Sequence, residues 1–222
     1  LTASTTYYFK MWSYTNSGSN IDFKTDGTPP TDDATTDAGG GASQDDIIIS
    51  ELCDPQNNYA DDRYIEIYNP TGSTIDLTGA QVVAVGNGSD IFTWTLSGTI
   101  DPCEALICGD ATTSGAFTAD FAEETWSNNN GSWNGKSGDG AYYKNSSGTT
   151  IDDASSHGSF ENKNSIRNSD INNPNVSYTS SEWTSSGVTD AGSGDSNPGT
   201  HINDDCSGSS NDSDAEVATI AQ

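Results

Sequence analysis

Basic residues are scarce in this sequence. Seven lysines and arginines stand against 33 aspartates and glutamates, which gives a formal net charge of −26 over 222 residues. Proteins that bind duplex nucleic acid or an anionic membrane surface need clustered Lys and Arg to displace counterions. The composition therefore argues against both kinds of partner, and we expect no nucleic-acid binding.

Long apolar segments are also lacking. The longest apolar run lies near residues 47–49, far short of the roughly 20 residues that span a bilayer, so we expect no membrane insertion. The first residues, Leu1 to Ser4, do not have the basic start and apolar stretch of a signal peptide. Because the sequence begins without Met, we expect an excerpt or a processed product of a longer chain.

Histidine is rare, and the common catalytic motifs are missing. His157 and His201 both lie among turn residues, and the sequence contains no G-x-S-x-G, H-E-x-x-H or P-loop motif. Two carboxylates, Glu51 and Glu66, lie inside apolar strands. We expect them to hold backbone amides or Arg167, with a glycosidase pair as the remote alternative. The sequence therefore predicts a protein that is not an enzyme and has no catalytic residues.

Aromatic residues and short alternating segments predict an all-β fold. Apolar residues make up only 31% of the chain, but 6 Phe, 5 Trp and 9 Tyr are too many for a disordered tail. Short strands separated by turns indicate a sandwich or a barrel. The expected strands are residues 46–52, 63–69, 74–77, 80–85, 91–96, 104–108, 141–144 and 149–152.

Four cysteines suggest two disulfides and an oxidising compartment. Four cysteines allow three connectivities. We favour Cys53–Cys108, because both residues flank short apolar strands, which leaves Cys103–Cys206 as the second pair.

The two ends differ in composition from the middle of the chain. Residues 1–28 alternate in the manner of a hairpin, and Tyr7, Phe9 and Met11 share one face. This segment resembles the last two strands of a fibronectin type III module. Residues 29–45 are rich in Pro, Gly and Asp and are interpreted as a linker. Residues 203–222 are interpreted as an acidic linker followed by one isolated strand at residues 216–220.

Residues 46–202 resemble a lamin tail domain, an immunoglobulin-like β-sandwich. Its most specific motif is matched by residues 63–70, Arg-Tyr-Ile-Glu-Ile-Tyr-Asn-Pro, and its next step by residues 75–79, Ile-Asp-Leu-Thr-Gly. Ala80 stands where the family usually has Trp, and Cys103 where it has Gly. These departures suggest a divergent bacterial branch. The resemblance implies a secreted or cell-surface module, found in relatives beside fibronectin-type repeats and sometimes beside nucleases or phosphoesterases.

Clustered acidic and amide side chains make calcium the expected cofactor, if there is one. Calcium prefers six to eight oxygen ligands from Asp, Asn and carbonyl groups. One candidate loop offers Asp54, Asn57, Asn58, Asp61 and Asp62, and a second group near the C-terminus offers Asp212, Asp214 and Glu216.

The sequence as a whole predicts a non-enzymatic extracellular module with a structural or adhesive role. Its expected partners are neighbouring protein modules or identical subunits, and surface glycans bound by Trp126, Trp133 or Trp183 are a further candidate. Two alternatives stay open. The chain could be a fibre subunit assembled by strand addition through its ends, or an accessory module of a secreted nuclease or phosphoesterase.

Overall fold

A computed structural model describes residues 6–10, 14–15, 22–23, 31–35, 41–123, 126, 130–204 and 206. The chain divides into two compact units, Leu1–Gly41 with Ser213–Gln222, and Ala42–Asp212. Among the described residues, no helix is long and apolar enough to cross a membrane.

The first unit contains two short strand pairs. β1 (Thr6–Lys10) pairs antiparallel with β4 (Thr31–Thr35), and β2 (Tyr14–Thr15) pairs with β3 (Asp22–Phe23). The expected single hairpin is therefore wrong, because the partner of β1 lies inside the segment interpreted as a linker. The prolines and glycines that suggested a linker flank β4 and do not occur within it. The isolated strand expected at residues 216–220 lies outside the described residues.

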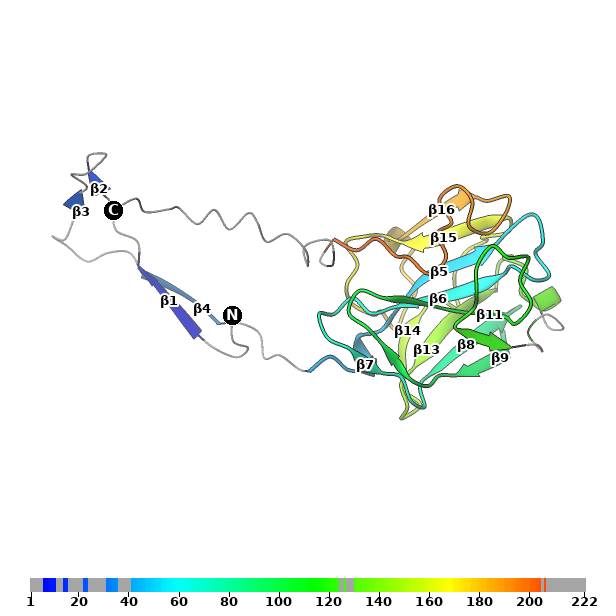
Figure 1. The fold of residues 1–222 in the computed structure, drawn as a ribbon, viewed down its shortest axis with the longest axis horizontal. Coiled ribbons are helices and arrows are strands. Elements are labelled where there is room, and N and C mark those ends of the chain that lie inside the picture. The colour runs from blue at the N-terminus through cyan, green and yellow to red at the C-terminus, as the bar shows by residue number, and fades with distance from the viewer. Residues whose placement is uncertain are drawn as a thin grey trace. The chain divides into compact units, whose positions relative to one another are not determined.

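The second unit is a sandwich of two sheets with a small additional strand pair (Figure 1). The six-stranded sheet has the order β12 (Phe121–Glu123), β11 (Ala105–Asp110), β6 (Tyr64–Tyr68), β5 (Ile48–Asp54), β15 (Lys163–Arg167), β16 (Trp183–Gly187). The four-stranded sheet has the order β14 (Thr150–Asp153), β13 (Gly140–Lys144), β8 (Gln81–Gly86), β9 (Ser89–Thr95). β7 (Ile75–Asp76) pairs with β10 (Thr99–Ile100), and three short 3-10 helices are Gln44–Asp46, Asn130–Ser132 and Ser180–Glu182.

Alternating side chains of the two sheets build the core. On β6, Ile65 and Ile67 point into the core, where Val82 and Ala84 of β8 belong to the same buried cluster. The burial of each large aliphatic side chain contributes roughly 1.5–3 kcal/mol. The expected alternation of the β6 segment is therefore confirmed, as is the all-β sandwich.

A chain of aromatic rings runs through the core. Trp126 contacts Trp133 with ring centroids 5.6 Å apart, and Trp133 contacts Phe160 at 5.1 Å. His157 lies against both Phe160 and Trp183, at 5.4 and 5.2 Å. Trp126 and Trp133 are 0% exposed and Trp183 is 9% exposed. The glycan platform considered for these three tryptophans is therefore ruled out by their burial.

The outer face of the six-stranded sheet is covered by residues 188–204, which we call the strap. Val188 and Ala191 of the strap pack with Tyr64 in a second buried cluster. Further along, the His201 ring lies on Tyr68 with centroids 4.8 Å apart. The strap therefore buries the face of the sheet that the second sheet does not cover.

A disulfide joins Cys206, just beyond the strap, to Cys103 in the turn before β11, with a Cα–Cα distance of 5.7 Å. This expected pair is confirmed. The other expected pair is wrong, because Cys53 and Cys108 are free and buried. Cys53 on β5 aligns with Tyr64 of β6, while Cys108 on β11 flanks β6 from its other side. Strands two places apart are about 10 Å apart, too far for a disulfide. The two thiols also belong to clusters on opposite faces of the sheet.

Candidate binding groove

A groove of about 710 Å³ lies between the strap and the outer face of β15 and β16. Ile166 of β15 and Thr184 and Ser186 of β16 form its floor, and strap residues from Gly192 to Ile202 form its wall. The volume lies in the range of roughly 300–1,000 Å³ that is usual for ligand pockets.

The groove lining is polar, with few charges. Asn168, Ser169 and Thr200 contribute amide and hydroxyl groups, and the charged residues in the lining are Arg167 and Asp195. Such a lining can exchange hydrogen bonds with a neutral polar ligand or a polypeptide backbone. The ring of His201 also lines the groove, and its buried Nε2 has no hydrogen-bond partner among the described residues.

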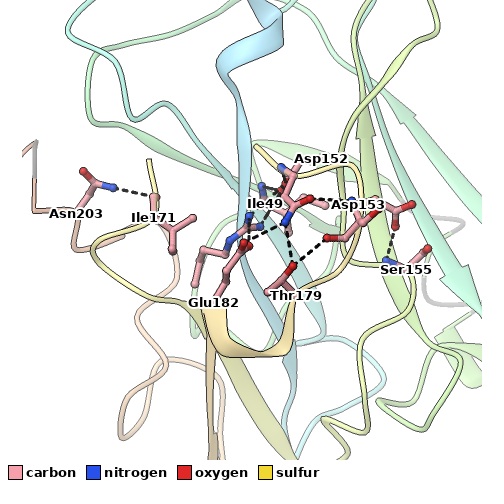
Figure 2. A network of polar contacts seen from close by, with 11 residues as sticks. Ile49, Asp152, Asp153, Ser155, Ile171, Thr179, Glu182 and Asn203 are labelled. Atoms are coloured by element: carbon pink, nitrogen blue, oxygen red, sulfur yellow. Dashed lines mark hydrogen bonds and ion pairs between the residues drawn. The ribbon is translucent and has the colours of Figure 1, made fainter. Parts of the chain in front are cut away.

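Arg167 forms an ionic network with Asp152 and Glu182, two residues that Figure 2 labels. Its guanidinium contacts Asp152 at 3.0 Å and Glu182 at 2.7 Å. Asp152 also accepts hydrogen bonds from the backbone amides of Ile49 and Asn175, both at 2.7 Å. The network joins β5, β14 and β15 with the loop before β16. Since two carboxylates compensate its charge, Arg167 is a poor site for an additional anion.

Two buried carboxylates hold the strap to the sheet. Glu66 accepts hydrogen bonds from the hydroxyl of Ser50 at 2.6 Å and from the backbone amide of strap residue Gly199 at 2.8 Å. Glu51 accepts a hydrogen bond from the Tyr64 hydroxyl at 2.8 Å. Glu51 and Glu66 are 1% and 0% exposed. The prediction that they hold backbone amides is confirmed, because Glu66 accepts from Gly199 and Glu51 has a backbone hydrogen bond with strap residue Asn197.

Of the two expected partners, backbone amides or Arg167, the structure shows the amides, since Arg167 binds Asp152 and Glu182. Burial, followed by the nearby charge of Glu66, raises the pKa of Glu51 to about 8. Burial raises the pKa of Glu66 to about 7. Although raised pKa values are typical of active-site acids, these two carboxyl groups lie beneath the strap. A glycosidic bond has no access to them.

His157 forms a hydrogen-bonded chain with two serines. Its Nδ1 lies 2.9 Å from the carbonyl oxygen of Gly158, which can only accept, so Nδ1 carries the proton and Nε2 accepts. Nε2 lies 2.7 Å from the hydroxyl of Ser165, which in turn lies 2.7 Å from the hydroxyl of Ser185. This order of groups is similar to a serine–histidine pair. However, Ser165 is 0% exposed and His157 is 4% exposed, so neither can meet a substrate.

A family model described as Lamin Tail Domain matches residues 41–158, more than half of the chain. The chain belongs to the lamin tail domain family. Searches of curated proteins and of solved structures find no match. In this lamin tail domain, β15, β16, the strap and the groove lie beyond the matched residues. The match does not reach residues 1–28, and the expected resemblance of that segment to fibronectin type III stays a prediction.

The lamin tail domain does not gather the expected calcium ligands. Asp54 binds Arg63, and Asp62 accepts hydrogen bonds from the backbone and hydroxyl of Ser114. The amide of Asn57 donates to Asp190. Asn58 has a φ of 50° at a turn, and Asp61 lies in the same loop. Among the described residues, no group of three or more His, Cys, Asp or Glu side chains could hold a metal ion. Asp212, Asp214 and Glu216 lie outside the described residues.

Sequence reasoning missed the groove of the lamin tail domain. Its strands, β15 and β16, are made mainly of Lys, Asn, Ser, Thr, Arg and Gly, so they carry weak strand signals. The expected strands did not include either of them. The sequence feature that could have indicated these strands is one isolated large apolar residue in each of them, Ile166 in β15 and Trp183 in β16.

Proposed function

We propose that this lamin tail domain is a non-enzymatic extracellular module with a structural or adhesive role in a larger secreted or cell-surface protein. The observation that supports the proposal is the burial of the polar groups that could otherwise act in catalysis. Glu66, Ser165 and His157, which could serve chemistry elsewhere, are sealed from solvent. What stays open to solvent is a polar groove.

The disulfide suits the proposed location. Cys103 and Cys206 close a bond across a sequence separation of 103 residues and anchor the chain beyond the strap. Such bonds form and persist in oxidising compartments. A module that works outside the cell gains from this covalent anchor.

The nuclease or phosphoesterase accessory alternative gains no support from the groove. Binding to a phosphodiester would need uncompensated positive charge, and the groove offers only Arg167, which two carboxylates already bind. A direct role in nucleic-acid binding is therefore disfavoured, and this alternative depends on neighbouring domains.

Hydrolysis assays test the absence of catalysis. The purified chain is expected to release no nitrophenol from p-nitrophenyl acetate, phosphate, phosphodiester or glucoside above the buffer rate. Turnover that disappears in Ser165→Ala or Glu66→Gln would contradict the proposal. Protease shaving of intact cells that produce the parent chain should release this domain, and full protection until lysis would contradict the extracellular location.

A further inference from the structure

One edge of the six-stranded sheet lacks the features that usually protect sheet edges. β16, Trp183–Gly187, pairs with β15 on one side and has no strand on the other among the described residues. It contains no charged residue, no proline and no shift in register. Natural proteins protect edges with charges, prolines, bulges or very short strands, because an open edge can accept another strand.

The three other edges of the two sandwich sheets are protected. β12 has only three residues and includes Glu123. β9 contains Asp90, and its pairing with β8 shifts in register. β14 also pairs with a register shift, and its residue Asp153 donates its amide to Asn175, so a loop covers part of that edge. Among these edges, β16 therefore stands out because it has neither a charged residue nor a register shift.

The hydrogen-bond pattern shows which backbone groups of β16 point outward. The amide of Asn168 donates to Glu182, and that of Val188 donates to Asn162, at the two ends of the β15–β16 ladder. Hydrogen-bonded pairs alternate in an antiparallel ladder. By this alternation the N–H and C=O groups of Ser185 and Gly187 point away from β15. No hydrogen bond from another described segment reaches these groups.

The groove lies beside this edge. The side chains of Thr184 and Ser186 form part of its floor. A strand added to β16 would direct alternate side chains toward the same face, where Ile166 and the strap residue Asp195 would meet them. The edge would provide backbone hydrogen bonds, and the groove would provide side-chain contacts.

We propose that β16 and the adjacent groove dock an extended polypeptide segment with basic side chains, supplied by a partner protein. The positive charge of the partner follows from complementarity, since Asp195 carries an exposed carboxylate in the groove and the chain has a net charge of −26. A second copy of this chain would bring the same negative charge to the edge. The inference rests on the proposed role as a binding module and names its class of partner.

A matched pair of variants at Gly187 tests the backbone contribution. An added Cβ meets no atom within 4 Å at this position, so the Cβ of either substitution lies in open space. Gly187→Pro removes an outward N–H, whereas Gly187→Ala keeps it. The probe is a fluorescent decapeptide of alternating lysine and threonine, with alternating lysine and glycine as the control of equal charge and weaker strand propensity.

The lysine–threonine peptide should bind the wild type and Gly187→Ala, and bind Gly187→Pro about tenfold more weakly by fluorescence anisotropy. The lysine–glycine peptide should bind the wild type about tenfold more weakly. Hydrogen exchange at the amides of Ser185 and Gly187 should slow when the peptide is bound. If Gly187→Pro does not fold, Gly187→Lys replaces it, because the added cation repels a basic strand.

Equal affinity for Gly187→Pro and Gly187→Ala, unchanged exchange at the two amides, or no binding would each overturn the inference. Self-association of the wild type that Gly187→Pro abolishes would overturn it in favour of a second copy. The hydrolysis assays are independent of these measurements, so failure of the docking inference leaves the non-catalytic proposal separately testable.

Discussion

Glu51 and Glu66 lie directly opposite each other in the β5–β6 ladder. Both side chains are buried beneath the strap. Two like charges on adjacent strands are unfavourable in a buried site. The packing of the strap on the sheet therefore depends on whether Glu51 and Glu66 are protonated.

Stability should fall as pH rises through the range of these two groups. Folding raises the pKa of Glu51 from 4.5 to about 8 and that of Glu66 from 4.5 to about 7. The folded state therefore binds these protons more tightly, and their contribution is complete below pH 4.5 and is lost as pH rises to about 8. Burial lowers the pKa values of His157 and His201 from 6.5, so their contribution to stability rises with pH up to about 6.5 and opposes the effect of the two carboxyl groups in that range. Urea titrations between pH 6.5 and 8 should show a falling free energy of unfolding.

Glu51→Gln should reduce that slope, because the amide cannot ionise, and should stabilise the domain relative to the wild type at pH 8. Glu161→Gln, at an exposed position, is the matched control and should leave the slope unchanged. A slope that is the same in the wild type and in Glu51→Gln would show that the pair does not control this pH dependence.

Loss of the disulfide should destabilise the domain substantially. A closed loop of about 100 residues restricts the unfolded chain by up to about 4.7 kcal/mol in the chain-entropy model, and measured effects are typically about 2–4 kcal/mol. Cys103→Ser combined with Cys206→Ser should therefore lower the free energy of unfolding by about 2–4 kcal/mol. A reducing agent should have the same effect on the wild type and none on the double variant.

The thiols of Cys53 and Cys108 provide a further check on this pairing. Both are buried and free, so alkylation should modify them only after unfolding. Mass spectrometry of the denatured, unreduced chain should find two alkylated cysteines. No alkylation under these conditions would show a second disulfide and contradict the structure.

The sequence was sufficient to predict strands whose burial follows from their own pattern. In β6, Ile65 and Ile67 alternate with Tyr64 and Tyr68, and that period of two places the aliphatic side chains in the core. The sequence could not predict β15 in the same way. Its residue Arg167 is buried because it pairs with Asp152 of β14 and Glu182 before β16, and these contacts do not follow from the pattern of β15 itself.

Local sequence patterns were also insufficient to predict the cysteine pairing and the groove. Apolar flanks could not decide the partner of Cys53, because pairing depends on which face of which strand each thiol occupies. The groove depends on the strap folding back over β15 and β16, which is a tertiary arrangement. No local motif encodes that arrangement.

Removal of the Asp152 carboxylate should be strongly destabilising. It would leave the buried Arg167 without one of its two carboxylate partners and the amides of Ile49 and Asn175 without an acceptor. Breaking a buried ion pair from one side costs roughly 3–5 kcal/mol. Asp152→Ala should therefore lower the free energy of unfolding by about that amount in urea titrations. Lys136→Ala, which breaks an exposed ion pair with Glu161, should cause little change.

Gly140 should tolerate no side chain. A Cβ at this position would lie 2.2 Å from the carbonyl oxygen of Ala154 and 2.8 Å from the Cα of Ser155, both backbone atoms of the adjoining segment. The β13 strand would have to move away, disturbing the buried hydrogen bond from the Trp133 indole to the Gly140 carbonyl at 2.8 Å. Overpacking of this kind typically costs about 1–3 kcal/mol, and backbone clashes cost more.

Gly158→Ala is the matched control, because an added Cβ there meets no atom within 4 Å. Thermal unfolding should show a large decrease in Tm for Gly140→Ala and almost none for Gly158→Ala. Because Trp133 lies in the aromatic chain, its fluorescence should change in Gly140→Ala at temperatures below the transition. Equal Tm values for the two variants would mean that β13 and the segment after β14 are not packed as closely as the structure shows.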